Sequence, residues 1–410
     1  MTALRAAEPF RLGPLTLRNR ITKAATFEGV MPKGRVTEEL IAFHRRVAAG
    51  GAALTTVAYC AVAPGGRTQR HTLVMDDALV PDLRRLTDAV HAEGAAASAQ
   101  LGHAGLVANV RSNGCPTLAP SARFSAPAMT RVPAATRAQL DEVVGMFRRA
   151  ARVAVAAGFD AVEIHLGHGY LLSSFLSPDL NRRRDDYGGD IEARSRFPRR
   201  VVAAVRDEVG DAIAVTAKLG MVDGPADGLA VEDSLVVARL LEADGHLDAL
   251  QLTAGSSLRD SMYLFRGDVP LDEMVAAQPR LVGLGLRLVS GRMFPRYPFE
   301  EAYLLPLARR FRAALTMPLT LLGGINRLDT IEDGLAEGFD LVAMGRALLI
   351  EPDLPNRMLA GAASAGTCTH CNRCMPTIYS GTRCVVTHPD VPARPTPVGR
   401  SASPAATVAR

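Results

Sequence analysis

Two histidines, His165 and His168, lie three residues apart directly after a short apolar run, and Tyr170 follows two residues later. Imidazoles at this spacing can donate hydrogen bonds to a substrate oxygen that gains negative charge, or they can bind a zinc ion. No third metal ligand is evident nearby, which favours the hydrogen-bonding interpretation. A phenol, with a reference pKa of about 10, stays protonated at neutral pH and is a candidate proton donor. Packing at the rim of the fold is the alternative role for Tyr170.

A second cluster of reactive side chains lies near the C-terminus. Four of the six cysteines are Cys368, Cys371, Cys374 and Cys384. Four thiolates in such spacing can bind a [4Fe–4S] cluster. A structural zinc ion with Cys or His370 ligands, or free thiols that pack this segment on the rest of the chain, are the alternatives. The sparse cysteines exclude a disulfide scaffold and favour a reducing compartment.

The elements that position these residues follow from the hydrophobic pattern. Short apolar runs alternate with amphipathic stretches, which is typical of buried parallel strands connected by helices. We expect strands at residues 19–27, 53–57, 95–100, 161–165, 213–219, 247–252, 319–322 and 341–344. Helices are expected at 38–49, 81–93, 137–157, 192–208, 231–243, 300–314 and 330–337.

Eight alternating units predict a single closed (β/α)8 TIM barrel within residues 1–365. An open doubly wound sheet is the alternative, and the absence of a G-x-G-x-x-G motif after a strand disfavours it. The stretch Ser256–Tyr297 is too long for a connector and is expected to form a lid after the sixth strand. Residues 366–390 form the Cys-rich extension, and the Pro-, Ala-, Ser- and Arg-rich residues 391–410 are expected to be a disordered tail.

Composition limits the classes of function. The chain is 48% hydrophobic and 22% charged, with a formal net charge of +5. Its basic residues are interleaved with acids, as in Arg182 to Asp186, so a nucleic-acid surface is not expected. No run of 18 apolar residues and no export signal is present, which predicts a cytoplasmic protein without membrane insertion.

The block from Gly158 to Phe197, GFDAVEIHLGHGYLLSSFLSPDLNRRRDDYGGDIEARSRF, resembles the old yellow enzyme family. These proteins are FMN-dependent ene-reductases and NADH:flavin oxidoreductases, and the resemblance extends over roughly residues 8–360. It implies that the chain takes hydride from NADH or NADPH and reduces the activated C=C bond of a small enone or related substrate. A flavin-binding redox sensor and a metal-dependent barrel lyase are alternatives from other classes.

The resemblance also implies roles for individual residues. His165 and His168 would bind the substrate carbonyl oxygen, and Tyr170 would protonate the α-carbon. Gln100 would contact the flavin pyrimidine edge, Lys218 would lie near N1 and O2, and the loop glycines with Arg346 would bind the phosphate. The full set of implied FMN contacts is Ala24, Ala25, Thr26, Phe27, Tyr59, Gln100, Lys218, Gly323, Gly324, Gly345 and Arg346.

Two features depart from the family pattern. Relatives carry Thr or Cys near the flavin C4 oxygen, whereas this chain has Phe27 there, with Thr26 just before it. The cysteine segment resembles that of trimethylamine dehydrogenase and 2,4-dienoyl-CoA reductase, but its last interval is shorter and no nucleotide-binding domain follows it. An amine dehydrogenase, demethylase or dienoyl reductase that uses the iron–sulfur cluster is therefore an alternative activity. Whether the chain forms a homo-oligomer stays open.

Overall fold

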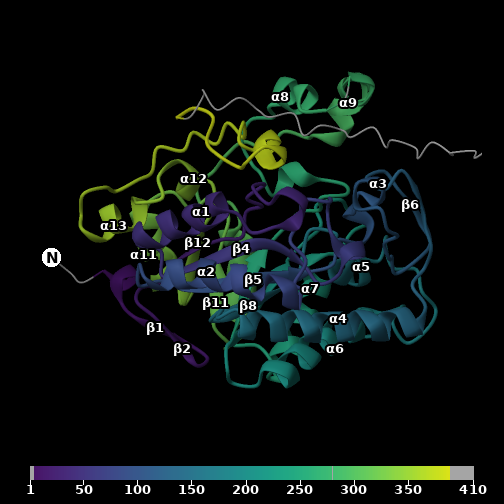
Figure 1. The fold of residues 1–410 in the computed structure, drawn as a ribbon, viewed down its shortest axis with the longest axis horizontal. Coiled ribbons are helices and arrows are strands. Elements are labelled where there is room, and N and C mark those ends of the chain that lie inside the picture. Colours follow the sequence, from purple (N-terminus) through teal and green to yellow (C-terminus); the bar gives the residue numbers. More distant parts are fainter. Residues whose placement is uncertain (1–3, 279, 388–410) are drawn as a thin grey trace, which may run out of the picture.

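The chain forms a closed barrel of eight parallel strands, in the order β10-β11-β12-β3-β4-β5-β8-β9 (Figure 1). The computed structural model describes residues 4–278 and 280–387. The barrel strands are β3 (Ile21–Lys23), β4 (Leu54–Ala61), β5 (Ala96–Gly102), β8 (Ala161–Leu166), β9 (Ala214–Gly220), β10 (Ala249–Thr253), β11 (Leu319–Leu321) and β12 (Leu341–Met344). The predicted (β/α)8 barrel is confirmed.

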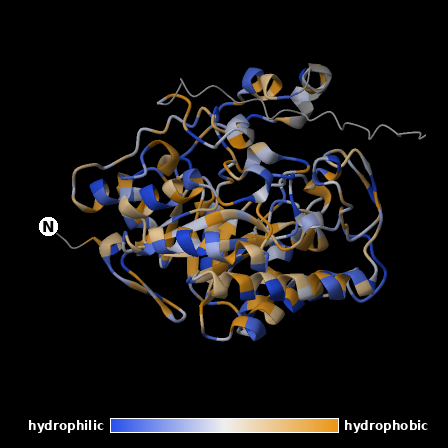
Figure 2. Cartoon of the chain, in the orientation of Figure 1, coloured by the Kyte–Doolittle hydropathy of each residue, from blue (hydrophilic) through white to orange (hydrophobic). Residues whose placement is uncertain are grey.

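Helices surround the barrel and bury one face against it. They are α1 (Glu38–Ala49), α2 (Val80–His91), α4 (Arg137–Ala156), α6 (Ile191–Val209), α7 (Val231–Asp244), α10 (Leu305–Ala314), α11 (Leu328–Ala336), α12 (Ala347–Ile350) and α13 (Leu354–Leu359). Helix α1 begins where the Thr37 side chain accepts a hydrogen bond from the Leu40 N–H, and α4 begins with a Thr136–Gln139 capping box. The two-sided colouring of these helices reflects their amphipathic sequences (Figure 2).

A short hairpin that the sequence pattern did not predict seals one end of the barrel. Strands β1 (Phe10–Leu12) and β2 (Leu15–Leu17) pair antiparallel, and Leu12 and Leu17 pack against residues at the starts of the barrel strands, among them Ala53 and Ala214. This apolar plug excludes water from the N-terminal end of the barrel. Polar chemistry is therefore confined to the opposite end, as in other barrels of this type.

Three insertions cover the C-terminal end of the barrel. After β5 come α3 (Val110–Asn113) and the hairpin of β6 (Arg123–Ser125) and β7 (Thr130–Val132). The segment after β10 carries α8 (Leu271–Ala276) and α9 (Arg280–Met293), so the predicted lid is largely helical. The Cys-rich extension turns through a 3-10 helix at Met375–Tyr379, which contacts α8 (Figure 1).

The predicted tail at 391–410, together with the last three residues of the predicted extension, lies outside the described residues. Within the described ranges, none of the helices combines the length and the apolar character needed to cross a bilayer.

Candidate active site

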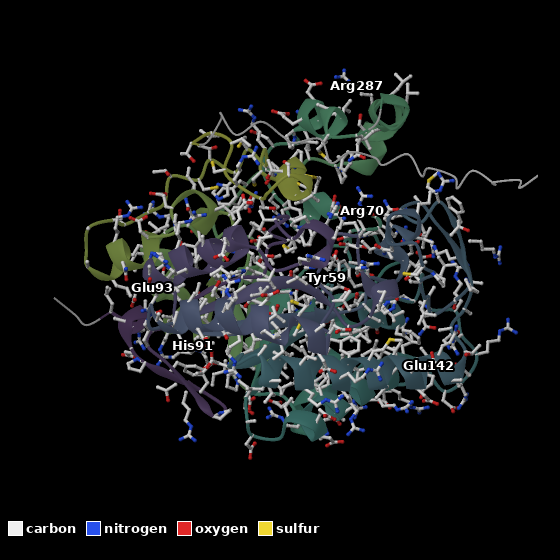
Figure 3. All side chains as sticks on the ribbon, in the orientation of Figure 1. Tyr59, Arg70, His91, Glu93, Glu142 and Arg287 are labelled. Carbon is white, nitrogen blue, oxygen red and sulfur yellow. The ribbon has the colours of Figure 1, made fainter. Side chains whose placement is uncertain are left out.

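A cavity of about 330 Å³ opens at the C-terminal ends of the barrel strands. Every catalytic and FMN-contacting residue predicted from the sequence lines it, so the structure brings these residues together: Ala24, Ala25, Thr26, Phe27, Tyr59, Gln100, His165, His168, Tyr170, Lys218, Gly323, Gly324, Gly345 and Arg346. The sequence pattern missed other lining residues, including Thr253, Tyr303 and His370. In Figure 3, Tyr59 lies within the body of the molecule, whereas Arg287 and Glu142 lie at its periphery.

The histidine pair forms a hydrogen-bonded chain with Thr253 at the end of β10. His168 Nδ1 lies 3.2 Å from His165 Nε2, and His168 Nε2 lies 2.9 Å from Thr253 Oγ1. The backbone of His168 is left-handed, with φ 62°, and the following Gly169 continues the tight turn at φ 74°. This turn folds the second imidazole back onto the first.

Both imidazoles are neutral at physiological pH. Burial lowers the pKa of His168 to about 3, and burial with the nearby His168 and Lys218 lowers the pKa of His165 well below its usual value. A neutral ring carries one N–H, and both nitrogens of His168 are already engaged. The arrangement therefore differs from the expectation of two available N–H donors. Among the described residues, His165 Nδ1 is the nitrogen of the pair without a partner.

Thr253 decides which tautomer the pair adopts. If its hydroxyl donates to His168 Nε2, then His168 Nδ1–H donates to His165 Nε2, and His165 carries its proton on Nδ1. We expect Thr253→Val to lower the turnover rate about fivefold, because a hydrogen bond of roughly 1 kcal/mol that selects this tautomer is lost. Thr22→Val is the control, since the Thr22 hydroxyl bonds the Val342 carbonyl oxygen and Thr22 does not line the cavity. Equal turnover of the Thr253 variant and the parent would contradict this role.

Buried histidines also make the fold sensitive to acid. Burial lowers the pKa of His103 to about 4, and the pKa values of His165 and His168 are lower than usual as well. Below about pH 6.5 the unfolded chain binds protons that the folded chain does not, so the free energy of unfolding falls as pH falls. Between about pH 6 and pH 5, the free energy of unfolding should fall less steeply for the His103→Asn variant than for the parent. The expected difference in slope is about 1.4 kcal/mol per pH unit. Urea unfolding at the two pH values measures this difference, and parallel slopes would refute it.

Aromatic rings pack on the histidine pair. The Tyr170 ring centroid lies 4.6 Å from that of His165 and 5.1 Å from that of Tyr59, both edge to face. The Tyr59 hydroxyl donates to the Gly66 carbonyl oxygen at 2.7 Å, and burial raises the pKa of Tyr59 well above its usual value. Tyr59 is therefore a neutral, fixed wall residue, whereas Tyr170 is half-buried beside the His165 imidazole.

A buried carboxylate that the sequence pattern missed organises the floor of the cavity. Glu163 Oε1 accepts hydrogen bonds from Gln100 Nε2 at 2.7 Å and lies 3.1 Å from Lys218 Nζ, while Oε2 accepts from Gln251 Nε2. These side chains come from the adjacent strands β5, β8, β9 and β10. Glu163 thus holds Gln100 and Lys218 in place and balances the lysine charge in the apolar interior.

The opposite side of the cavity is built from glycines and Arg346. Gly323 and Gly324 have φ 111° and 75°, and a Cβ on Gly324 would lie 2.6 Å from the Tyr303 ring. Arg346 Nη1 donates to the Arg266 carbonyl oxygen at 3.0 Å and to Asn372 Oδ1. In the closed strand order, β12, which precedes Arg346, lies opposite β8, which carries Glu163.

Comparison with known proteins identifies the family. The profile of the NADH:flavin oxidoreductase / NADH oxidase family matches residues 7–253. The 4,4'-dithiodibutanoate disulfide reductase of Rhodococcus erythropolis is 65% identical over 379 residues, which are 92% of this chain and 94% of the relative. The chain belongs to the NADH:flavin oxidoreductase / NADH oxidase family. It is therefore a flavin-dependent oxidoreductase, as the sequence resemblance predicted.

Solved structures share the fold of this NADH:flavin oxidoreductase. A 2-naphthoyl-CoA reductase bound to 2-naphthoyl-CoA superposes with a TM-score of 0.80 at 24% identity, covering 93% of this chain and 56% of that chain. The old yellow enzyme homologue from Zymomonas mobilis superposes with a TM-score of 0.70 at 23% identity, covering 94% and 99%. Both share the barrel fold that the sequence predicted.

The donor set of the cavity fits the flavin that the family name implies. Gln100 and Lys218 supply polar groups on one side, small Ala24 and Ala25 leave room for a planar ring, and Arg346 supplies a cation on the far side. An amide next to an ammonium suits a pyrimidine edge, and a guanidinium suits a phosphate. The side chains therefore match a ring system with an anionic tail.

The four cysteines of the extension line one small cavity of about 40 Å³, next to the flavin cavity. None of them forms a disulfide, and Cys374 lines both cavities. In the described part of the chain, no three His, Cys, Asp or Glu side chains converge on a single metal ion. The cysteine segment is thus part of the wall of the main cavity, which the sequence pattern did not predict.

Proposed function

We propose that this NADH:flavin oxidoreductase binds FMN, takes electrons from NADH or NADPH, and cleaves the S–S bond of a small aliphatic disulfide such as 4,4'-dithiodibutanoate. The observation that carries the proposal is the 65% identity to the Rhodococcus erythropolis 4,4'-dithiodibutanoate disulfide reductase over 94% of that protein. The reaction balances as one disulfide, one hydride and one proton giving two thiols. Bound FMN would supply the hydride transfer from nicotinamide to acceptor.

The side chains of the site suit an acceptor that gains negative charge. Hydride addition to one sulfur leaves charge on the departing sulfur, and His165, whose Nδ1 has no partner among the described residues, is the donor closest in type to an oxyanion-hole group. The neutral state of the pair matters, because an N–H donor stabilises this charge without being consumed by the reaction. Gln100, Lys218 and Arg346 would hold the FMN, and Glu163 would hold the first two of these.

Ene-reduction is a second candidate, and Tyr170 is the observation that favours it. The Tyr170 ring lies 4.6 Å from the His165 ring, so the phenol is next to the group that would bind an enone oxygen. Reduction of an enone leaves a strongly basic α-carbon that a phenol can protonate. A thiolate is far less basic than this α-carbon, so its protonation depends much less on a phenol of pKa about 10.

Tyr170→Phe separates the two candidates. If the natural acceptor is a disulfide, the variant should retain its rate with 4,4'-dithiodibutanoate to within about twofold and lose about tenfold or more with 2-cyclohexenone. Anaerobic NADH and NADPH oxidation with each acceptor measures both rates, and a thiol reagent counts the product thiols. A parent enzyme that reduces cyclohexenone but not the disulfide would refute the disulfide proposal and leave ene-reduction.

We also propose that Cys368, Cys371, Cys374 and Cys384 bind a [4Fe–4S] cluster. Their arrangement around one cavity supports this, whereas a structural zinc ion would need three or four side chains that converge on one point, which the described residues lack. Iron and acid-labile sulfide analysis of the purified protein tests it, with the absorbance near 400 nm after flavin removal. Zinc without sulfide, or four titratable thiols without metal, would refute it.

A further inference from the structure

Lys23 is a fully buried lysine at the end of β3, immediately before the cavity wall. It is 0% exposed, and the chain contains only two other lysines, Lys33 and Lys218. Its ammonium group donates to the Ala24 carbonyl oxygen at 2.6 Å and to Thr26 Oγ1 at 2.7 Å. An ammonium group in a protein interior is costly to desolvate, so its retention here indicates a role beyond packing.

While Lys23 is protonated, the direction of the Lys23–Thr26 hydrogen bond is fixed by chemistry. An ammonium group has donors and no acceptor, so the Thr26 oxygen must accept. The Thr26 hydroxyl hydrogen then remains for another acceptor, and no further hydrogen bond of the Thr26 side chain occurs within residues 4–278 and 280–387. Thr26 lines the flavin cavity. A hydroxyl that accepts from a cation is also a stronger donor, because the two hydrogen bonds polarise each other.

A carboxylate and an aromatic ring lie near Lys23. Glu28 is 1% exposed, and its Oε1 accepts from the Ala58 N–H at 3.0 Å and lies 3.2 Å from His44 Nε2. Burial lowers the pKa of Lys23 to about 7, an effect that Glu28 opposes and Lys218 reinforces. The Phe43 ring centroid lies 5.7 Å from the Lys23 nitrogen. Lys23 and Glu28 thus fix two stretches of the cavity wall, one at Thr26 and one at Ala58.

We infer that Lys23 is a positioning residue that makes the Thr26 hydroxyl a polarised hydrogen-bond donor toward the bound flavin and so favours the reduced flavin. The inference rests on the proposed binding of FMN in this cavity. It accounts for the departure at Phe27, because the hydroxyl that relatives present from the next position comes here from Thr26. A donor aimed at a ring that gains negative charge on reduction raises the fraction of reduced flavin at a given ambient potential.

The flavin midpoint potential of the FMN-loaded enzyme at about pH 6, where Lys23 is protonated, tests the inference. At one fixed ambient potential, Lys23→Met should lower the ratio of reduced to oxidised flavin about tenfold, as expected for a lost charge-assisted hydrogen bond. Thr26→Val should lower it to a similar extent, and Thr26→Ser should match the parent. Lys33→Met is the matched control, because Lys33 is exposed and away from the cavity.

The double variant Lys23→Met/Thr26→Val decides whether the lysine acts through the hydroxyl. If it does, adding Lys23→Met to Thr26→Val changes the ratio less than about threefold. A full tenfold change in that background, or no change in either single variant, would overturn the inference. If Lys23→Met does not fold, the comparison of Thr26→Val with Thr26→Ser decides. Equal ratios of reduced to oxidised flavin in these two variants would overturn the inference. A parent protein that takes up no FMN would instead refute the proposed function.

Discussion

Replacing His165 by Ala is expected to lower the turnover rate with the acceptor about a hundredfold, while the protein keeps its flavin. The loss follows from the geometry of the pair, in which both nitrogens of His168 are engaged and His165 Nδ1 has no partner among the described residues. Removal of one donor to a developing negative charge typically costs about 10²- to 10³-fold in rate. Because His168 acts through His165, His168→Ala should cost less, about tenfold.

Initial rates of anaerobic NADH or NADPH oxidation at saturating acceptor measure this effect, with the flavin content of each variant determined from its absorbance. His91→Ala is a suitable control, since His91 lies on α2, has a side chain 39% exposed, and pairs with Asp160 away from the cavity. A flavin-loaded His165→Ala variant as fast as the parent would contradict the assignment. A His168→Ala variant slower than His165→Ala would show that His168 contacts the acceptor and that His165 acts through His168.

The barrel could be predicted from the sequence because its strands are buried on both sides. Each strand is therefore a short, mostly apolar run, and the alternation with amphipathic helices identifies the class. The first strand was predicted at 19–27 but ends at Lys23, because the next residues leave the barrel to line the cavity. The β1–β2 hairpin escaped prediction because strands of three residues carry too little pattern.

The candidate site could be predicted to the extent that its residues stand at strand ends. Their partners could not, because the contacts Glu163–Lys218, Thr253–His168 and Gln251–Glu163 arise only from the register of β8, β9 and β10 in the barrel. No local pattern in the sequence encodes that register. The positions of His370 and Cys374 could not be predicted either, since these residues reach the cavity from an extension that follows the last barrel strand.

Thr26 and Phe27 were both predicted as FMN contacts, although successive side chains face opposite ways in a strand. Both line the cavity, because the backbone after Lys23 is no longer a strand. The buried lysine that fixes this segment could have been noticed in the sequence, since a lysine within an apolar stretch has no solvent to face.

Arg346→Ala is expected to weaken FMN binding about a hundredfold and to leave riboflavin binding within about twofold of the parent. The two ligands differ by the phosphate, and a guanidinium–phosphate contact contributes roughly 1.5 to 3 kcal/mol. The Arg346 side chain is already oriented by the Arg266 carbonyl oxygen and Asn372, so little ordering is left to oppose binding.

Titration of flavin-depleted protein with each ligand measures the two affinities, and Arg327→Ala is the control, because Arg327 is exposed and pairs with Asp329. Equal losses for FMN and riboflavin would show that Arg346 supports the cavity wall and not the phosphate. Arg346→Lys separates charge from geometry. If charge alone matters, lysine restores FMN binding, whereas a requirement for the planar guanidinium, which Asn372 and the Arg266 carbonyl hold in one orientation, leaves FMN binding close to that of the alanine variant.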